Sequence, residues 1–236
     1  MCLYGDIGAG KTLYAVKEAI KYMQKGWYIF TNFPLRYATV ISYPAFVNYN
    51  FPKNSLIIID EANIWFNSRE WKKLTLNAML KFTQSRKLGY DIIYTTQRPE
   101  AVDVQLRDIT TIFCKIEGWY ILSLLKWHSK PNFADSDKRK YDLGITPFFP
   151  KLYTHLYKYY DTYALVRPDL DFPPMDYLSY WIYYNEKIAD RKDFAKTYGV
   201  DIQVKKPIEI KKELNRLKNE RAKNMHFFAR FFLNRF

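Results

Sequence analysis

The sequence has few of the residues that build disulfide scaffolds or zinc centres. It contains 2 cysteines and 3 histidines among 236 residues. Cys2 and Cys114 lie in apolar, strand-like surroundings, which favours core positions over a disulfide or a metal ligand. The histidines are scattered without the spacing of a ligand set. We therefore expect neither a disulfide framework nor a zinc site.

Long hydrophobic segments are also missing. No apolar run reaches the roughly 18 residues that indicate a membrane-spanning helix. A glycine-rich loop begins at Gly5, which leaves no room before it for a signal peptide. We expect a soluble, cytoplasmic protein.

Negative charge is in short supply. The chain has 37 Lys and Arg residues against 24 Asp and Glu, a net charge of +13 with a pI near 9.5. Such a balance indicates an anionic partner, either nucleic acid or an anionic membrane surface. Charge alone does not choose between the two.

What the sequence does have is a complete phosphate-binding loop of the form G-x-x-x-x-G-K-[ST]. The glycines let backbone N–H groups face the β-phosphate, Lys11 reaches the β- and γ-phosphates, and the hydroxyl of Thr12 binds Mg²⁺. An apolar run at 2–4 precedes the loop and a helical pattern at 11–24 follows it, so the motif has the required strand–loop–helix context. We predict binding of ATP and Mg²⁺ here, with nucleotide contacts from Gly5, Asp6, Ile7, Gly8, Ala9, Gly10, Lys11 and Thr12.

The first half of the chain alternates strands and helices. Strand patterns cover 27–31, 55–60, 91–96 and 111–116, and the run from Ser55 to Asp60 is continuously apolar, as in a buried parallel strand. A helical pattern covers 68–87, with Ser68 as a candidate N-cap and Gly89 just beyond the end. This alternation predicts an α/β domain with a mostly parallel sheet.

The second half changes character. We expect a loop insertion at about 128–152, a returning strand at 157–166, and a domain boundary at the prolines that follow, dividing 1–167 from 168–236. Helices are predicted near 177–189, 191–198 and 208–234. Residues 185–236 hold 14 Lys or Arg against 7 Asp or Glu. The extension is therefore expected to be helical and basic.

A second group of polar residues completes a hydrolytic site. Asp60, at the end of the apolar strand, can hold Mg²⁺ through water, and Glu61 can activate the water that attacks the γ-phosphate. Gln97 follows the next strand, and the carboxyl ends of parallel strands line one crevice. We assign Asp60 and Thr12 to the metal, Lys11 and Glu61 to catalysis, and Gln97 to sensing the γ-phosphate.

These motifs, taken in order, resemble the zonular occludens toxin (Zot) family. The resemblance spans roughly 1–165 and rests on the loop, Asp60-Glu61, the segments 85–89 and 96–99, Val102-Asp103, Leu106-Arg107 and the Tyr-Tyr-Asp-Thr-Tyr segment at 159–163. It implies a three-layer P-loop NTPase fold of the additional-strand, catalytic-glutamate type. The family comprises assembly and extrusion ATPases of filamentous phages, related to DNA-translocating and viral genome-packaging ATPases.

The resemblance also implies a ring in which a neighbouring subunit supplies an arginine. Arg107 is the first candidate, with Arg86 and Arg98 as rivals. For each of them, a surface salt bridge or a DNA-phosphate contact is an equally good interpretation.

Several functions stay open at this point. The leading hypothesis is a viral motor that forms a homo-oligomeric ring and moves double-stranded DNA. The alternative is a morphogenesis ATPase that acts on protein at a membrane, with the phenylalanine-rich helix near 227–236 contacting a membrane or capsid protein. A P-loop nucleotide kinase and an ATP-binding scaffold with little turnover are further alternatives, and the Asp60-Glu61 pair argues against the kinase.

Overall fold

The computed structural model describes residues 1–69, 75–118, 122–129, 143–161, 164, 166 and 170–188. The chain divides into two compact units, Met1–Tyr184 and Asn185–Phe236. The first unit thus extends past the boundary expected at 167. The helices predicted at 191–198 and 208–234, and the phenylalanine-rich residues 227–236, lie outside the described residues.

A nine-stranded sheet forms the centre of the first unit, with the strand order β8-β7-β6-β1-β5-β4-β2-β3-β9. The strands from β6 to β3 in this order run parallel to one another, whereas β7, β8 and β9 pair antiparallel. The mostly parallel α/β sheet is therefore confirmed. The strands are β1 (Cys2–Tyr4), β2 (Tyr28–Thr31), β3 (Thr39–Val40), β4 (Ser55–Ile59), β5 (Tyr90–Thr96), β6 (Ile112–Gly118), β7 (Ser123–Ser129), β8 (Gly144–Phe148) and β9 (Met175–Asp176).

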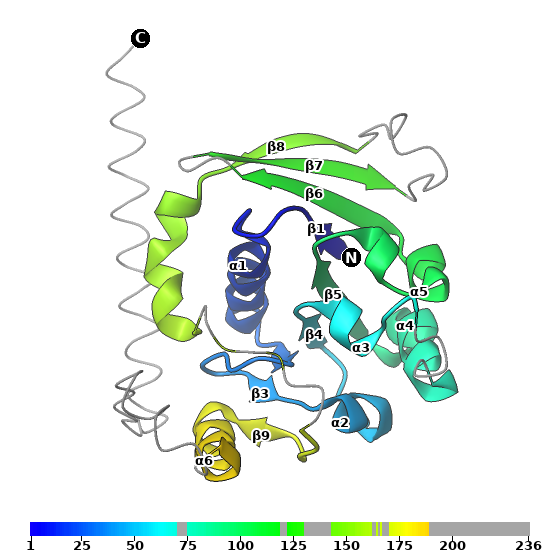
Figure 1. Cartoon of the computed structure of the whole chain (residues 1–236), viewed down its shortest axis with the longest axis vertical. Coiled ribbons are helices and arrows are strands. Elements are labelled where there is room, and N and C mark those ends of the chain that lie inside the picture. Colours follow the sequence, from blue (N-terminus) through cyan, green and yellow to red (C-terminus); the bar gives the residue numbers. More distant parts are fainter. Residues whose placement is uncertain are drawn as a thin grey trace. The chain divides into compact units, whose positions relative to one another are not determined.

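Helices cover both faces of the sheet. Figure 1 shows α1 and the 3₁₀ helix η4 on one side, and α3, α4 and α5 on the other. This arrangement gives the three layers of the predicted fold. The helices are α1 (Lys11–Gln24), α2 (Tyr43–Asn48), α3 (Ala62–Trp65), α4 (Leu76–Leu88), η2 (Pro99–Ala101), α5 (Val104–Ile109), η4 (Pro150–Tyr159) and α6 (Tyr177–Ile188).

The strands at the middle of the sheet are apolar because both of their faces are covered. Every residue of β4 is buried, and so are six of the seven in β5. Behind them lies an aromatic cluster centred on Phe46, which is 0% exposed and has the rings of Phe51, Trp65, Phe66 and Phe82 at centroid distances of 5.7–6.2 Å. Residues of β4 and β5 and this aromatic cluster belong to one hydrophobic core.

Helix α4 begins later than its sequence pattern suggests. Thr75, not Ser68, is the N-cap, and its hydroxyl accepts a hydrogen bond from the N–H of Ala78. Gly89 ends the helix in the left-handed conformation, as predicted. Ser68 instead donates its backbone N–H to the carbonyl of Ala101.

The loop insertion expected at about 128–152 falls mostly on residues 130–142, which lie outside the described residues. The described residues at its two ends complete β7, form β8 and begin η4. The strand expected at 157–166 is wrong, because residues up to Tyr159 belong to η4. Tyr160 alone forms a bridge, to Leu35. We call β6, β7 and β8 the antiparallel wing.

The chain then returns to the far edge of the sheet. Strand β9 pairs with β3 through Met175 and Val40, and α6 follows directly, as predicted near 177–189. Aromatic side chains from this part are buried, namely Phe172, Tyr180, Trp181 and Tyr184. None of the described helices is long and apolar enough to cross a membrane.

Candidate nucleotide and metal site

The loop between β1 and α1 has the backbone geometry of a phosphate-binding loop. Gly5, Gly8 and Gly10 have φ values of +146°, +80° and +94°, a region that favours glycine. A Cβ on Gly5 would lie 2.2 Å from the carbonyl oxygen of Ile116, so no larger residue fits. Helix α1 starts at Lys11, so its N-terminal N–H groups and positive dipole end adjoin the loop.

Lys11 is held on this loop. Its Nζ donates to the carbonyl oxygens of Gly5 and Asp6, each at 2.9 Å, and only 7% of the residue is exposed. Burial lowers the pKa of Lys11, while Glu61, Asp60 and Asp6 act in the opposite direction. The site thus combines one buried ammonium group with carboxylates on the neighbouring strand end.

Asp60 follows β4 and faces Thr12 across the start of α1. Thr12 Oγ1 lies 3.1 Å from both carboxylate oxygens, and Thr95 Oγ1 donates to Oδ1 at 2.5 Å. Removal of water raises the pKa of Asp60, and the hydrogen bonds from Thr95 and Thr12 oppose that rise. A hydroxyl beside a carboxylate is the kind of oxygen ligand pair that Mg²⁺ prefers, so these residues fit the predicted metal.

Asn32 fixes the backbone of Asp60 and was missed at the sequence level. Its Nδ2 donates to the carbonyl of Asp60 at 2.8 Å, and its Oδ1 accepts the N–H of Asp60 at 2.7 Å. Asn32 directly follows β2, the strand that pairs with β4. Only its place at a strand end could have suggested it.

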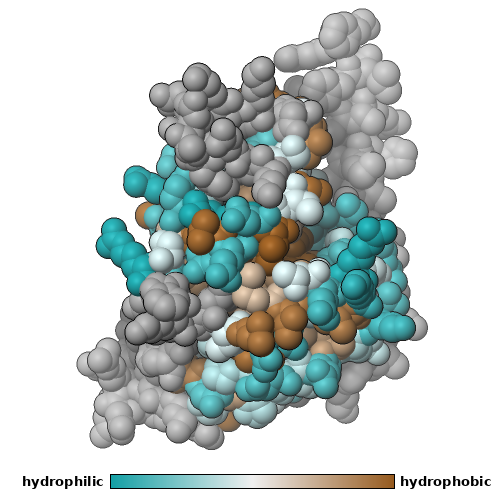
Figure 2. All heavy atoms as spheres, turned by 90° about the vertical axis from the view of Figure 1, so that its right-hand side faces the viewer, coloured by the Kyte–Doolittle hydropathy of each residue, from teal (hydrophilic) through white to brown (hydrophobic). Residues whose placement is uncertain are grey.

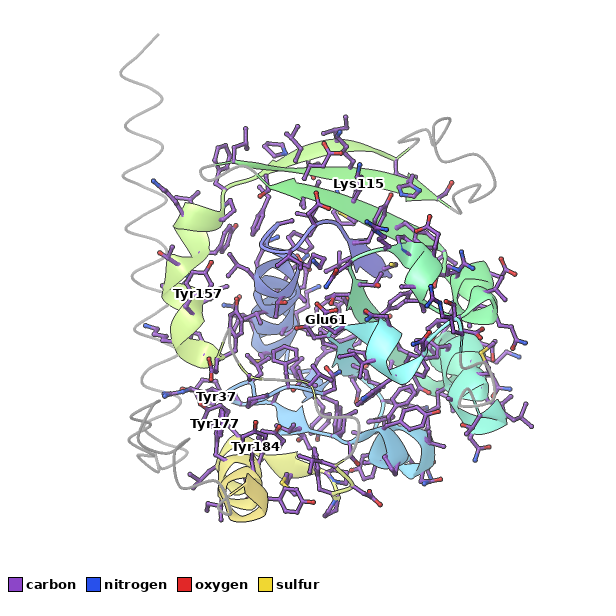
Figure 3. The ribbon with its side chains drawn as sticks, viewed as in Figure 1. Tyr37, Glu61, Lys115, Tyr157, Tyr177 and Tyr184 are labelled. Atoms are coloured by element: carbon purple, nitrogen blue, oxygen red, sulfur yellow. The ribbon has the colours of Figure 1, made fainter. Side chains whose placement is uncertain are left out.

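Glu61 has an unusual backbone conformation. It lies in the left-handed region with φ 48° and ψ 53°, and its N–H donates to Thr95 Oγ1 at 3.0 Å. Such a conformation is uncommon for a residue other than glycine, asparagine or aspartate, and is often found at functional sites. It turns the chain sharply after β4, and Figure 3 shows Glu61 at the beginning of α3, on the side facing α1.

The carboxylate of Glu61 is linked to Gln97. Burial and the neighbouring Asp60 raise the pKa of Glu61, whereas Lys11 and a hydrogen bond from the side chain of Gln97 lower it. The carbonyl of Gln97 accepts the N–H of Gly5 at 3.3 Å, so the end of β5 also contacts the phosphate loop. The structure therefore brings together Lys11, Thr12, Asp60, Glu61 and Gln97.

The candidate arginines lie elsewhere. Arg107 is in the last turn of α5 and is half-buried, and its charge influences the pKa of Tyr94. Arg86 and Arg98 are exposed, in α4 and after β5. None of the three is among the described residues that line the cavity at the phosphate loop.

That cavity has a volume of about 410 Å³ and two walls. The phosphate loop, the start of α1, Asp60, Glu61 and Ile64 form one wall. Side chains from the end of η4 and the residues after it form the other, with Phe33 between the two. The residues of this second wall are Tyr157, Tyr160, Asp161, Ala164 and Val166.

The antiparallel wing also contacts the phosphate loop, through residues that no motif indicated. Gly118 and Ser123 pair across β6 and β7. A Cβ on Gly118 would lie 2.9 Å from Cα of Ala9, and Ser123 Oγ donates to the carbonyl of Ala9 at 3.5 Å. Small side chains at both positions let the hairpin approach the loop.

Comparison with known proteins supports the family resemblance that the sequence motifs indicate. A family model described as zonular occludens toxin (Zot) matches residues 34–165, more than half of the chain. The chain belongs to the Zot family. The geometry of the phosphate loop agrees with this membership.

Relatives of this Zot-family chain occur in phages. The Gene 1 protein of Salmonella phage IKe is 28% identical over 245 residues, covering 82% of this chain and 64% of the relative. The Gene 1 protein of Enterobacteria phage I2-2 is 31% identical over 140 residues, covering 47% of this chain and 38% of the relative. The chain thus spans less than two thirds of the length of these relatives.

A solved structure confirms the fold. The N-terminal domain of zonular occludens toxin from Neisseria meningitidis aligns with a TM-score of 0.51 and 20% sequence identity. The alignment covers 68% of this chain and 97% of that domain.

Proposed function

We propose that this Zot-family chain is a Mg²⁺-dependent ATPase of virion assembly. Two contacts carry the proposal: Thr12 with Asp60, both of which line the cavity, and Glu61 of the same lining with Gln97 at the end of β5. A carboxylate beside a metal-binding pair can activate the water that hydrolysis needs, and a kinase built on the same loop usually has no second carboxylate there.

Each residue has a distinct part in the proposed reaction. Mg²⁺, when bound, neutralises charge on the β- and γ-phosphates. Lys11 and the backbone N–H groups of the loop hold the phosphates, and Thr12 and Asp60 supply oxygen ligands or hold metal-bound water. Glu61, with its raised pKa, orients the attacking water and takes up its proton. Gln97 joins that carboxylate to the end of β5.

Hydrolysis of ATP by purified full-length protein tests this directly. We expect phosphate release with Mg²⁺, none with EDTA, and loss of activity in Lys11→Ala and Glu61→Gln. The two variants separate binding from chemistry, because Glu61→Gln should still bind ATP while Lys11→Ala should not. Metal-independent hydrolysis, or a fully active Glu61→Gln, would count against the proposal.

We further propose that the ATPase works as a ring in which Arg107 reaches a neighbouring site. Figure 2 views the right-hand side of Figure 1 and shows hydrophobic residues exposed among hydrophilic ones. Arg107 belongs to α5, which packs beside α4. Leu76, Val104 and Leu80 are 74%, 54% and 40% exposed there. Such a surface suits contact with another copy of the chain. An arginine supplied in this way typically contributes about 10³–10⁵ in rate.

Double-stranded DNA is the proposed moved substrate. The support is the net charge of +13, which favours a polyanion. Native mass spectrometry with an ATP analogue and duplex DNA measures subunit number and DNA retention together. DNA-stimulated hydrolysis is the expected result, and hydrolysis indifferent to DNA in every oligomeric state would exclude a DNA motor.

A morphogenesis ATPase that acts on protein at a membrane is the second candidate. It is favoured by the five phenylalanines at 227–236, which alternate with basic residues in the sequence. Flotation of the full chain with liposomes, with and without anionic lipid, distinguishes it. Binding to anionic liposomes together with DNA-independent hydrolysis would support this candidate over the first.

A further inference from the structure

The second wall of the cavity is anchored to the sheet. The N–H of Arg36 donates to the carbonyl of Tyr159 at 2.8 Å, and Leu35 and Tyr160 form an antiparallel bridge. Figure 3 labels Tyr157 on η4, one turn before this anchor. Tyr160 is therefore held in a defined place opposite the phosphate loop. Tyr160 and Asp161 of the sequence motif belong to this wall.

Tyr160 is buried, yet it borders the cavity. The residue is 5% exposed, and its ring packs edge-on against Phe33 at a centroid distance of 6.2 Å. It lines the same space as Thr12 and Asp60. Among the described residues, no hydrogen bond to its hydroxyl is found. A buried tyrosine hydroxyl usually has a partner, so one that opens into a binding cavity points to a ligand.

The charge around this hydroxyl indicates what it can bind. Burial, Tyr157 and the carboxylate of Asp60 all raise the pKa of Tyr160, so the hydroxyl keeps its proton at neutral pH. It is therefore a neutral hydrogen-bond donor on the metal side of the cavity. Phosphate oxygens are the acceptors that the proposed function brings there.

We propose that the Tyr160 hydroxyl donates a hydrogen bond to an oxygen of the bound Mg²⁺–triphosphate group. Tyr160 is then a nucleotide-binding residue contributed by the segment after η4, far in sequence from the phosphate loop. The ring packs against Phe33, which lines the same cavity. The inference rests on the proposed function, since it requires that Mg²⁺–ATP binds in this cavity.

Tyr160→Phe is the direct test, because it removes only the hydroxyl. Binding is measured at equilibrium with full-length protein, Mg²⁺ and a non-hydrolysable ATP analogue. A hydrogen bond to a charged group is worth enough that we expect Kd to rise about tenfold. Thermal unfolding without nucleotide should be unchanged, because no protein hydrogen bond is lost.

Tyr159→Phe is the matched control. Tyr159 is the adjacent buried tyrosine, 2% exposed, but its ring packs against Tyr37 and does not line the cavity. Its Kd for the analogue should stay within twofold of the original protein. An equal loss in both variants would mean that the effect comes from packing, and would overturn the assignment.

Inorganic tripolyphosphate with Mg²⁺ identifies the contacted part of the nucleotide. If Tyr160 contacts phosphate, Tyr160→Phe weakens tripolyphosphate binding by the same factor as the analogue. A loss seen only with the analogue would place the contact on the base or sugar and overturn the inference. Failure of the original protein to bind either probe would refute the proposed function itself, so the two failures are distinguishable.

Discussion

The parallel half of the sheet and the antiparallel wing both consist of β-strands, but their residues differ in how deeply they are buried. All five residues of β4 are buried, whereas only the last of the five in β8 is. The parallel strands at the middle of the sheet have helices on both faces, so their residues are mostly buried and apolar. Strands β7 and β8 are partly exposed and can carry charge. The polar residues of the candidate site lie where the buried strands end, because polar side chains from several strands can meet there without being buried in the apolar core.

The wing nevertheless takes part in the site, through shape instead of chemistry. It supplies no carboxylate or cation to the cavity lining, but Gly118 and Ser123 lie against Ala9 of the phosphate loop. The comparison therefore separates the residues proposed to act in the reaction from the small residues that let the wing approach the phosphate loop. Substitutions in the two halves should affect different measurable quantities.

The largest effect is expected at the reactive end of the parallel half. Glu61→Gln removes the proposed base while keeping its size, so the hydrolysis rate should fall at least about 100-fold. ATP affinity should change little, and single-turnover phosphate release measures the chemical step. If the variant loses binding and chemistry equally, Glu61 acts on the loop geometry and the contrast between the two halves weakens.

A smaller effect is expected where the wing meets the loop. In Gly118→Ala the new Cβ would press on the Ala9 backbone, so the loop must shift and Kd for Mg²⁺–ATP should rise by about one order of magnitude, or about 1.4 kcal/mol. Equilibrium binding of the analogue measures it. Ile145→Ala, an exposed change in β8 at 54% exposure, is the control within the wing and should leave Kd unaltered. Equal affinities in both variants would mean that the wing only covers the sheet.

Asp60→Asn should stabilise the nucleotide-free protein while removing metal binding. The folded-state pKa of Asp60 is raised, so keeping it ionised costs stability above its ordinary pKa. At neutral pH the variant should melt about 2–4 °C higher. The advantage should shrink as the pH falls and the original carboxyl takes up a proton. A lower melting temperature at neutral pH would show that the hydrogen bonds from Thr12 and Thr95 outweigh the loss of water.

The smallest effect is expected on the surface of the wing. Glu117 contacts Lys115 at 2.7 Å and Lys126 at 2.5 Å, and these hydrogen bonds lower its pKa. The stabilisation is present above the ordinary glutamate pKa and is lost as the pH falls through the lowered one. Because the pair is partly exposed, Glu117→Gln should cost about 0.5 kcal/mol or less, measured by urea unfolding at neutral pH. A cost several times larger would give the wing's charges a structural role.

The same contrast explains what the sequence could predict. The run Ser55–Ile59 and the phosphate loop carry strong local patterns, so β4 and the start of α1 are close to where they were expected. In the wing, β6 was expected at 111–116, but β7 and β8 were not, since Lys126 interrupts the apolar residues of β7. The strands of the wing are fixed by pairing with distant residues, which a local pattern does not contain.

Prediction of the site from the sequence was limited in a similar way. The residues that belong to motifs were predicted, and their proximity follows from a parallel sheet, in which the carboxyl ends of the strands lie at one edge. Asn32, Thr95 and Tyr160 were missed because each acts on Asp60 or its cavity from another strand or segment. For Asn32 and Thr95 the available signal was a polar residue near the end of a strand adjacent to β4, and for Tyr160 it was the motif at 159–163.

The two edges of the sheet share a feature that bears on how copies of this chain can associate. Strand β8, at one edge, contains Pro147, and β9, at the other, is two residues long and follows Pro173 and Pro174. Proline lacks the N–H that strand pairing requires, and short strands offer few bonding groups. Neighbouring copies are therefore discouraged from joining their sheets edge to edge, which leaves helical surfaces for assembly and makes fibre-like aggregation through these edges unfavourable.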